Sequence, residues 1–460
     1  MRRYELKKLA PIALLLVGLG VTLYAVPEAV RMLSKASGEK AEIIVDLEAV
    51  IGPMPRPWRN LAQGGEETGY MLGNVTGEIM ALRPEYIRLD HIYDMYEVVS
   101  QDGSGLRYDW SRLDEVVRSI LEIGAKPFFA LSYMPPAISK GDIIDQPKSW
   151  SDWEELVRVT IEHYSGREGL NINGIYYEVW NEPDLFGGWK VYGEKNYLDL
   201  YAATTRGAAR ARNVNSFKLG GPATTALYKN WVDQFLDYVV ESNLRLDFYS
   251  WHRYSRDLEQ YEKDMAEIDA WLENHPEKID LELIVSEWGH DSENDSGYDN
   301  GFGAIHTIAA TRVMMGRVNR AFVFEIKDGP GTEQYWGRWG VLTHEKFGDV
   351  VKKPRYNALM YLNTLGDERV SLDGEGSWVK GIAARKEGVY QVLLVNYDPK
   401  GSHNELVPVT FDNLPGGEFV YKRSDWGGGV KTITVATTSA QWRIEEPMRP
   451  NSTMMLTLEF

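Results

Sequence analysis

Two glutamates follow short, largely apolar runs that are typical of β-strands. Glu182 lies in Tyr-Tyr-Glu-Val-Trp-Asn-Glu-Pro-Asp at 176–184, and Glu287 lies in Leu-Ile-Val-Ser-Glu-Trp-Gly at 283–289. Pro183 ends the first run because proline has no N–H to donate, and Gly289 permits a sharp exit from the second. Two carboxyl groups in one pocket resist simultaneous ionisation, so one can donate a proton while the other stays ionised.

These runs belong to eight candidate strands that alternate with amphipathic segments at helical spacing. The candidate strands are 42–50, 86–92, 126–133, 174–179, 218–222, 246–251, 282–286 and 321–326. The candidate helices are 110–123, 153–164, 197–212, 231–241, 258–274, 302–315 and 355–365. This alternation predicts a parallel α/β fold. It favours a closed (β/α)₈ TIM barrel over a doubly wound sheet, because no Gly-rich phosphate loop follows the first candidate strand.

In such a barrel the carboxyl ends of all strands surround one mouth. Glu182 follows the fourth candidate strand and Glu287 follows the seventh, so we expect both carboxyl groups at that mouth. Such a pair suits glycoside hydrolysis, in which one carboxyl protonates the glycosidic oxygen and the other attacks or stabilises the anomeric carbon. Glu178 has the parity of Glu182 but lies further from the mouth, and we interpret it as structural.

The sequence pattern changes near residue 367, where short segments of strand-like alternation separated by Gly, Asn and Asp turns begin. We predict three parts: an N-terminal segment and linker at 1–40, the barrel at 41–366, and an antiparallel, β-sandwich-like accessory domain at 367–460. Four basic residues precede an almost uncharged run at 9–26 that is about long enough to cross a bilayer. We expect an uncleaved transmembrane anchor with the catalytic body outside; the alternative is a cleaved signal peptide and secretion.

Composition narrows the range of partners. The formal net charge of −17 argues against a nucleic-acid partner, since phosphate binding needs clustered Lys and Arg. Cysteine is absent, and the eight histidines form no His-Glu-x-x-His pattern, so we expect no cofactor and no metal. The 15 Trp and 26 Tyr suit contact with the apolar faces of sugar rings, although large barrels use many aromatic residues anyway. We therefore expect a carbohydrate substrate; the oligomeric state stays open.

Several further stretches make the chain resemble glycoside hydrolase family 39 of clan A, whose members include β-xylosidases and α-L-iduronidases. The resemblance runs from about residue 42 through the β-domain. Besides the two glutamates, it is carried by Arg88, Lys-Pro-Phe-Phe-Ala-Leu-Ser-Tyr-Met-Pro at 126–135, His252-x-Tyr254, Gly-Val-Leu-Thr at 340–343 and Lys-Pro-Arg-Tyr-Asn-Ala at 353–358.

The resemblance implies a role for several site residues. Glu182 matches the acid/base of the family, Glu287 its nucleophile, and Asn181 the residue that bonds the sugar 2-hydroxyl. Tyr254 is expected to hold Glu287 ionised and oriented from the sixth strand. Arg88 from the second strand and His252 from the sixth are also expected near the nucleophile. The expected substrate-binding residues are Asn181, Arg88, Asp90, His252, Tyr254, Trp288, Phe324 and Lys327.

Two departures weaken a direct transfer of xylose specificity. Xylosidases of the family typically carry Arg-x-His on the second strand, whereas this chain has Asp90 in place of that histidine and His91 displaced to the opposite face. On the eighth strand Phe324 stands where those enzymes carry a tryptophan. Lys327, with Arg253, offers a positive partner for a uronate carboxylate; the competing interpretation of Lys327 is a salt-bridged rim residue.

The sequence therefore predicts a retaining glycoside hydrolase that cleaves an extracellular oligo- or polysaccharide by double displacement, in the manner of a β-xylosidase or related exo-glycosidase. One alternative is an endo-acting hydrolase of exopolysaccharide or cell-surface glycan in the same family. A second alternative is a non-catalytic surface protein that binds carbohydrate. The segment 289–303, rich in Asp, Asn, Ser and Gly, is expected to form a mobile loop over the nucleophile.

Overall fold

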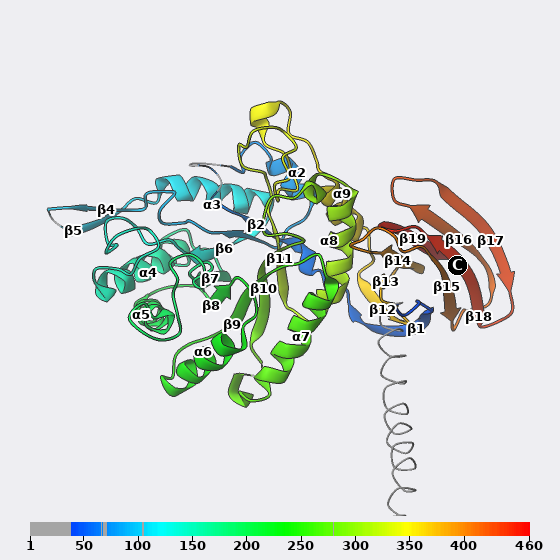
Figure 1. Ribbon diagram of the computed structural model, residues 1–460, viewed down its shortest axis with the longest axis horizontal. Helices are drawn as coiled ribbons and strands as arrows, with labels where there is room; N and C mark the ends of the chain where they lie inside the picture. The colour runs from blue at the N-terminus through cyan, green and yellow to red at the C-terminus, as the bar shows by residue number, and fades with distance from the viewer. Residues whose placement is uncertain (1–37, 66, 68–70, 104, 279) are drawn as a thin grey trace, which may run out of the picture. The chain divides into compact units, whose positions relative to one another are not determined.

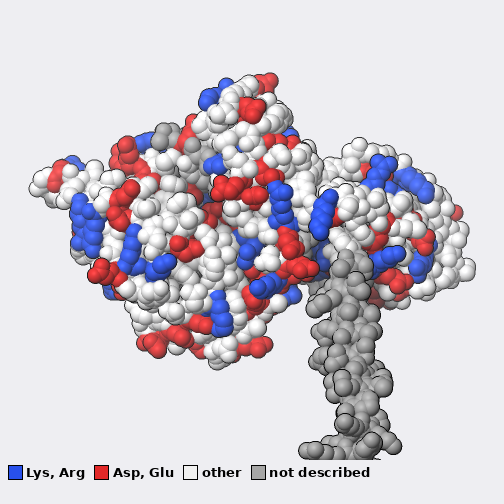
Figure 2. All heavy atoms as spheres, in the orientation of Figure 1, with Lys and Arg blue, Asp and Glu red and all other residues white. Residues whose placement is uncertain are grey.

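The structure is a computed structural model that describes residues 38–65, 67, 71–103, 105–278 and 280–460. The described chain divides into two compact units (Figure 1). One is Pro53–Asp367, and the other combines residues 38–52 with Glu368–Phe460. The space-filling view shows Lys and Arg interspersed with Asp and Glu on the visible face of each unit (Figure 2).

The larger unit contains a closed barrel of parallel strands in the order β10-β11-β2-β3-β6-β7-β8-β9. These strands are β2 (Asn60–Gln63), β3 (Tyr86–Leu89), β6 (Lys126–Leu131), β7 (Ile175–Val179), β8 (Phe217–Thr224), β9 (Phe248–Tyr254), β10 (Glu282–Gly289) and β11 (Arg320–Phe324). The barrel is therefore confirmed, and seven of its strands coincide with candidate strands within a few residues.

Bulky side chains from the barrel strands meet in one buried cluster inside the barrel. Its buried members are Ala62, Tyr86, Phe128, Tyr176, Phe248, Ile284, Phe322 and Phe324. Because strand residues alternate between two faces, the next inward positions on β3, β7 and β9 lie one layer nearer the carboxyl ends of the strands. These positions are Arg88, Glu178 and Ser250. The packed layer thus supports a polar layer above it.

The helices of the larger unit are α2 (Thr76–Ala81), α3 (Ser111–Ile123), α4 (Trp150–Tyr164), α5 (Tyr197–Arg210), α6 (Lys229–Glu241), α7 (Leu258–Leu272), α8 (Gly301–Met314) and α9 (Pro354–Leu362). Local sequence explains several of their ends. The side chains of Ser149, Asn196 and Asp257 accept hydrogen bonds from the first turns of α4, α5 and α7. Gly124 ends α3 with a φ of 90°, which glycine adopts without steric cost. Two antiparallel strands, β4 (Val99–Asp102) and β5 (Gly105–Tyr108), form a separate ribbon.

The first candidate barrel strand, 42–50, was wrongly assigned. This segment forms β1 (Ile43–Pro53), which belongs to the other unit and pairs in parallel with β15 (Glu405–Asp412). The barrel instead begins with β2, only four residues long and buried at every position. A short run without alternation gives no periodic signal, whereas β1 alternates between buried and exposed positions at its start.

The smaller unit is one nine-stranded sheet in the order β17-β16-β19-β14-β13-β12-β1-β15-β18. Its remaining strands are β12 (Glu368–Asp373), β13 (Val379–Lys386), β14 (Val389–Asn396), β16 (Gly417–Asp425), β17 (Val430–Thr437), β18 (Gln441–Met448) and β19 (Ser452–Glu459). An apolar core that includes Ile43, Val392, Val409 and Leu456 fills it. The unit is β-sandwich- or barrel-like as predicted, but the β1–β15 pair is parallel.

The expected anchor at 9–26 lies outside the described residues. Among the helices that the structure describes, none combines the length and hydropathy of a membrane span.

Candidate active site

Glu182 lies in a tight turn just beyond the carboxyl end of β7. Its backbone N–H donates to the carbonyl of Ala223 at 3.0 Å, which ties the turn to the end of β8. Its own carbonyl accepts from the N–H groups of Leu185 and Phe186 at 3.0 and 2.7 Å. Glu182 has a φ of 45°, a left-handed conformation that non-glycine residues rarely adopt. These bonds fix the backbone from which its carboxyl group projects.

Glu287 reaches the barrel interior because β10 carries a bulge. Ile284 on this strand points into the interior cluster, so strict alternation would turn Glu287 outward. The pairing of β10 with β9 shifts register between Val285 and Glu287, and Glu287 then stands opposite His252. A β-bulge inserts one residue and re-aims the side chains that follow it. The bulge therefore delivers the carboxylate to the cavity.

Arg88 on β3 connects three of the site residues. Its guanidinium donates to Glu178 Oε2 at 2.8 Å, to Glu287 Oε1 at 2.7 Å and to Asn181 Oδ1 at 2.7 Å. The side chain is only 1% exposed, so these bonds form away from water, where charge-assisted hydrogen bonds are strongest. Glu178 is fully buried and acts through Arg88, which matches its structural interpretation.

Burial raises the pKa of Glu287, and the positive charges of His252 and Arg88 offset part of this rise. The Tyr254 hydroxyl donates to Glu287 Oε2 at 2.9 Å, as predicted. Each carboxylate oxygen of Glu287 thus accepts one hydrogen bond, from Arg88 and Tyr254 respectively. Both bonds favour the ionised form that a nucleophile requires.

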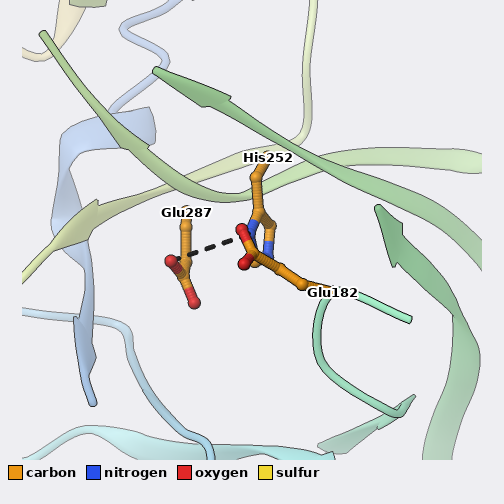
Figure 3. A group of neighbouring side chains, drawn as sticks. All are labelled: Glu182, His252 and Glu287. Carbon is orange, nitrogen blue, oxygen red and sulfur yellow. Dashed lines mark hydrogen bonds and ion pairs between the residues drawn. The ribbon is translucent and has the colours of Figure 1, made fainter. Parts of the chain in front are cut away.

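His252 lies between the two glutamates (Figure 3). Its Nδ1 is 2.8 Å from Glu182 Oε1 and 3.6 Å from Glu287 Oε2. Burial lowers the pKa of His252, but the neighbouring carboxylates of Glu287 and Glu182 outweigh this effect and raise the pKa above its ordinary value. One carboxylate oxygen of each glutamate and a ring nitrogen of His252 all lie within 4.8 Å of one another.

These three side chains also have the donor types of a metal site. The Arg88 guanidinium, however, already supplies a positive charge 2.7 Å from Glu287 Oε1. A divalent cation bound to the same carboxylate would be repelled at short range in a medium of low dielectric constant. The donor set therefore fits proton transfer and nucleophilic attack better than metal binding.

A cavity of about 660 Å³ opens above Glu182 and Glu287. It is lined by Gly64, Gly65, Asp90, His91, Tyr133, Asn181, Glu182, Leu185, Phe186, Thr225, Ala226, Arg253, Tyr254, Glu287, Ser292, Glu293, Phe324, Arg338 and Trp339. This volume is within the range of small-molecule sites, about 300–1,000 Å³. Arg88 and His252 are absent from the lining and act from beneath it.

The structure differs from the predicted site at three positions. Trp288 is buried with its ring near those of Tyr261 and His306, because the residue after Glu287 faces outward from the barrel. Lys327 lies outside the cavity, where its Nζ bonds Glu345 at 2.9 Å and Asn74 at 3.3 Å. This matches the competing interpretation of Lys327 as salt-bridged.

His91 was expected on the opposite face from Asp90, yet both line the cavity. Strand β3 ends at Leu89, and His91 has a φ of 53°, so strand alternation no longer applies there.

The cavity includes several residues beyond the predicted site. Tyr133 accepts a hydrogen bond from Asn181 Nδ2 at 2.9 Å and thereby helps to orient the amide. Its position just after the third strand was a usable signal. Trp339 comes from the long segment after β11, and the Arg338 guanidinium lies 3.4 Å from its ring centroid. The predicted loop 289–303 reaches the cavity through Ser292 and Glu293.

Several known proteins are similar in sequence to this chain. The sequence profile described as "Glycosyl hydrolases family 39" matches residues 77–287. A β-xylosidase of Geobacillus stearothermophilus is 27% identical over 66% of this chain and 64% of its own length, slightly less than two thirds. A β-xylosidase of Caldicellulosiruptor saccharolyticus is 28% identical over 72% of this chain and 71% of its own length.

A similar fold occurs in the crystal structure of a monomeric β-xylosidase from Caulobacter crescentus. The TM-score is 0.74 at 21% identity, and the superposition covers 91% of this chain and 99% of the other. At this identity the likeness concerns the fold alone.

Proposed function

Since the chain belongs to glycoside hydrolase family 39, we propose that it is a retaining, exo-acting glycosidase with Glu287 as nucleophile and Glu182 as acid/base. The observation that carries this proposal is the proximity of the two carboxylates, which have oxygen atoms within 4.8 Å of each other. Retaining enzymes place the two groups about 5–5.5 Å apart, whereas inverting enzymes need about 6.5–9.5 Å to admit a water molecule.

In the first half-reaction, the ionised Glu287 carboxylate attacks the anomeric carbon while the Glu182 carboxyl protonates the departing oxygen. The bond to the leaving group breaks, and a glycosyl ester forms on Glu287. In the second half-reaction, Glu182 removes a proton from water, which displaces the Glu287 carboxylate and releases the sugar with its original anomeric configuration.

The side chains that bond Glu287 and Asn181 orient these two groups for the reaction. Arg88 and Tyr254 bond the two oxygens of Glu287, which keeps the nucleophile ionised and oriented. Arg88 also donates to the side-chain oxygen of Asn181, and the side-chain nitrogen of Asn181 donates to the Tyr133 hydroxyl. The amide is thereby fixed for a contact with the sugar 2-hydroxyl, which strengthens in the transition state.

For the substrate we propose a neutral glycone of the β-xyloside class. Both bacterial relatives are named β-xylosidases. The cavity is lined by four residues that carry a carboxyl group and by only two arginines. One of the two arginines, Arg253, already donates to Asp264 through two nitrogens at 2.6 and 2.5 Å. Lys327 is bonded outside the cavity, so the argument for a uronate loses its main support.

The experiment compares Glu182→Gln and Glu287→Gln with wild type on a panel of aryl glycosides. Each variant should fold normally. Glu182→Gln should lose at least about 100-fold in turnover, the lower end of what a positioned proton-transfer group contributes, and Glu287→Gln, which lacks the attacking carboxylate, should lose at least as much. Glu85→Gln is the control, because this half-exposed glutamate precedes β3 at the opposite end of the barrel. Full activity in either site variant, or inversion seen by NMR of the first product, would contradict the mechanism.

Two alternatives are distinguished by products and binding. An exo-acting enzyme releases monosaccharide from xylo-oligosaccharides at the earliest time points, whereas an endo-acting one shortens a polysaccharide without monosaccharide. A non-catalytic binder would retain oligosaccharides unchanged. The connected set of Glu182, His252, Glu287 and Arg88 favours catalysis, since a binder has no need of two carboxylates joined through a buried histidine.

We also propose that residues 1–26 anchor the catalytic body outside the cell, on the basis of the basic residues and the apolar run that follows. Membrane fractionation followed by protease treatment of intact cells tests this proposal. Activity that pellets with membranes and is accessible to protease is expected. Soluble activity in the cytoplasm would contradict it, and soluble activity in the medium would indicate signal cleavage.

A further inference from the structure

The cavity wall beside Glu182 carries apolar side chains that the proposed catalytic steps do not use. Leu185 and Phe186 both line the cavity, yet they are 60% and 41% exposed. Ala226 lines it as well and is only partly buried. Leaving a large apolar side chain in water forgoes the free energy that its burial would supply. Exposed apolar groups at the rim of a polar catalytic cavity therefore suggest a surface that a ligand covers.

The wall is held in place by its own backbone. The carbonyl of Phe186 accepts from Trp180 Nε1 at 3.2 Å, and Trp189 N donates to the carbonyl of Pro183 at 2.8 Å. Gly187 follows with a φ of 103°, and a Cβ there would lie 2.5 Å from a backbone oxygen of another segment. Leu185 and Phe186 are thus presented by a defined turn.

The facing loop after β8 is joined to this turn. Asp184 accepts hydrogen bonds from Thr225 N at 3.0 Å and from Thr225 Oγ1 at 2.5 Å. Thr225 Oγ1 also lies 2.9 Å from the hydroxyl of Tyr228. The polar groups near Ala226 are therefore engaged with one another, which leaves apolar atoms as the principal contact that the wall offers.

Reaction geometry assigns the wall to one side of the scissile bond. The ring that is attacked must touch Glu287 and Asn181, whereas the departing oxygen must touch Glu182, which protonates it. The leaving group consequently extends past Glu182. Leu185 and Phe186 lie in the same turn as Glu182, after Pro183 and Asp184, and their N–H groups both bond the Glu182 carbonyl.

Another part of the cavity lining has a different origin and character. It comes from the segments that follow β3 and β11 and includes Asp90, His91 and Trp339. Its polar and aromatic groups suit a ring that is recognised through its hydroxyls. The lining therefore differs in character between this part and the apolar wall beside Glu182.

We propose that Leu185, Phe186 and Ala226 form the leaving-group subsite, and that they take a second sugar ring through its C–H face. The proposal rests on the retaining mechanism proposed above, which fixes the side on which the leaving group departs. An apolar wall contacts carbon-bound hydrogens and does not distinguish the orientation of hydroxyls. The subsite accordingly accepts different sugars or an aryl group, while the glycone side sets specificity.

Three donors with the same glycone test this subsite: xylobiose, 4-nitrophenyl β-xyloside and β-xylosyl azide. The azide has a small leaving group that cannot cover the wall. Phe186→Ala should lower kcat/KM on xylobiose about tenfold, as expected for the loss of one aromatic contact in a pocket. The nitrophenyl donor should lose a similar factor, and the azide less than about twofold. Leu185→Ala/Phe186→Ala should enlarge the difference between the donors.

Tyr192→Ala is the matched control, because Tyr192 is an aromatic residue of the same β7–α5 segment, is 62% exposed and lies outside the cavity lining. It should leave all three donors unchanged. Equal losses on xylobiose and azide in the Phe186 variant, or no loss on either, would overturn the subsite. A wild-type protein inactive on all three donors would instead refute the proposed β-xyloside function, and the subsite would fall with it.

Discussion

Replacing Arg88 with methionine removes the one guanidinium that bonds Glu178, Glu287 and Asn181 together. Methionine fills much of the same space without charge or hydrogen-bond donors. The change therefore isolates electrostatics from packing as far as a single substitution allows. Its main consequence concerns the protonation of Glu287, because the positive charge of Arg88 now lowers the pKa of that carboxyl against the effect of burial.

The expected change in the pH profile follows from the geometry. Arg88 Nη1 is 2.7 Å from Glu287 Oε1, close enough for the opposite charge to favour the ionised carboxylate. Without that charge the pKa of Glu287 rises further, so less of this carboxyl group is ionised at a given pH. The acid limb of the kcat/KM profile should therefore move to higher pH, and kcat/KM should fall about tenfold for each pH unit below the new limb.

The assay is a pH profile of kcat/KM on an aryl β-xyloside, measured with urea unfolding of the same samples. Removing one partner of a buried ion pair costs about 3–5 kcal/mol, so Arg88→Met should also be less stable. Arg88→Lys keeps the charge and should hold the acid limb nearer to wild type. Arg320→Met controls for stability, because Arg320 bonds Glu85 at the amino-terminal end of β11, away from the mouth.

One result would refute the reasoning about Arg88. If Arg88→Met loses activity equally at every pH and its acid limb stays where the wild-type limb is, Arg88 does not control the ionisation of Glu287. A matching shift in Arg320→Met would likewise show that the limb reports stability. Only a shift confined to the Arg88 variant supports the electrostatic role.

Three further outcomes are expected. Tyr254→Phe removes the bond to Glu287 Oε2 and should lower kcat/KM about 10–100-fold, the worth of one hydrogen bond to a charged group, with unchanged urea stability; an unaltered rate would contradict it. Burial raises the pKa of Asp328 to about 6 although it contacts the buried Lys353. Lys353→Met should raise that pKa further, and since a raised carboxyl pKa favours folding at low pH, urea unfolding should show a larger loss at pH 8 than at pH 5; equal losses would argue against it. Gly187→Ala should lower activity on xylobiose by displacing the turn that follows Glu182, and a wild-type rate would show that the turn tolerates a side chain.

Several residues of the candidate site could be predicted from the sequence because they lie at or near the ends of strands. Glu182 and Glu287 each follow an apolar run, and a barrel brings all such ends to one mouth. His252 and Tyr254 are two apart on β9 and so share a face, as alternation requires. These are local signals, although the direction of the Glu287 side chain also depends on the bulge in β10.

The predictions were wrong where the structure depends on which distant strand a segment pairs with, or on a local irregularity of a strand. The alternating pattern of β1 correctly predicted a strand, but its partner β15 lies near the other end of the chain, and no local pattern reveals that pairing. The bulge before Glu287 shifts the face of every later residue on β10, which is why Trp288 could not be placed by counting. Strand β3 ends at Leu89, so strand alternation does not determine the direction of the His91 side chain.

The parallel pairing of β1 with β15 makes the barrel an insertion within the sequence of the smaller unit. During synthesis β1 leaves the ribosome before any barrel strand and waits for its partner until the whole barrel has been made. An unpaired strand edge invites association with other chains, so this interval is a period of risk for misassembly. A truncated protein that stops at Asp367 would carry the same orphan strand permanently, and an isolated barrel should therefore also begin no earlier than Pro53.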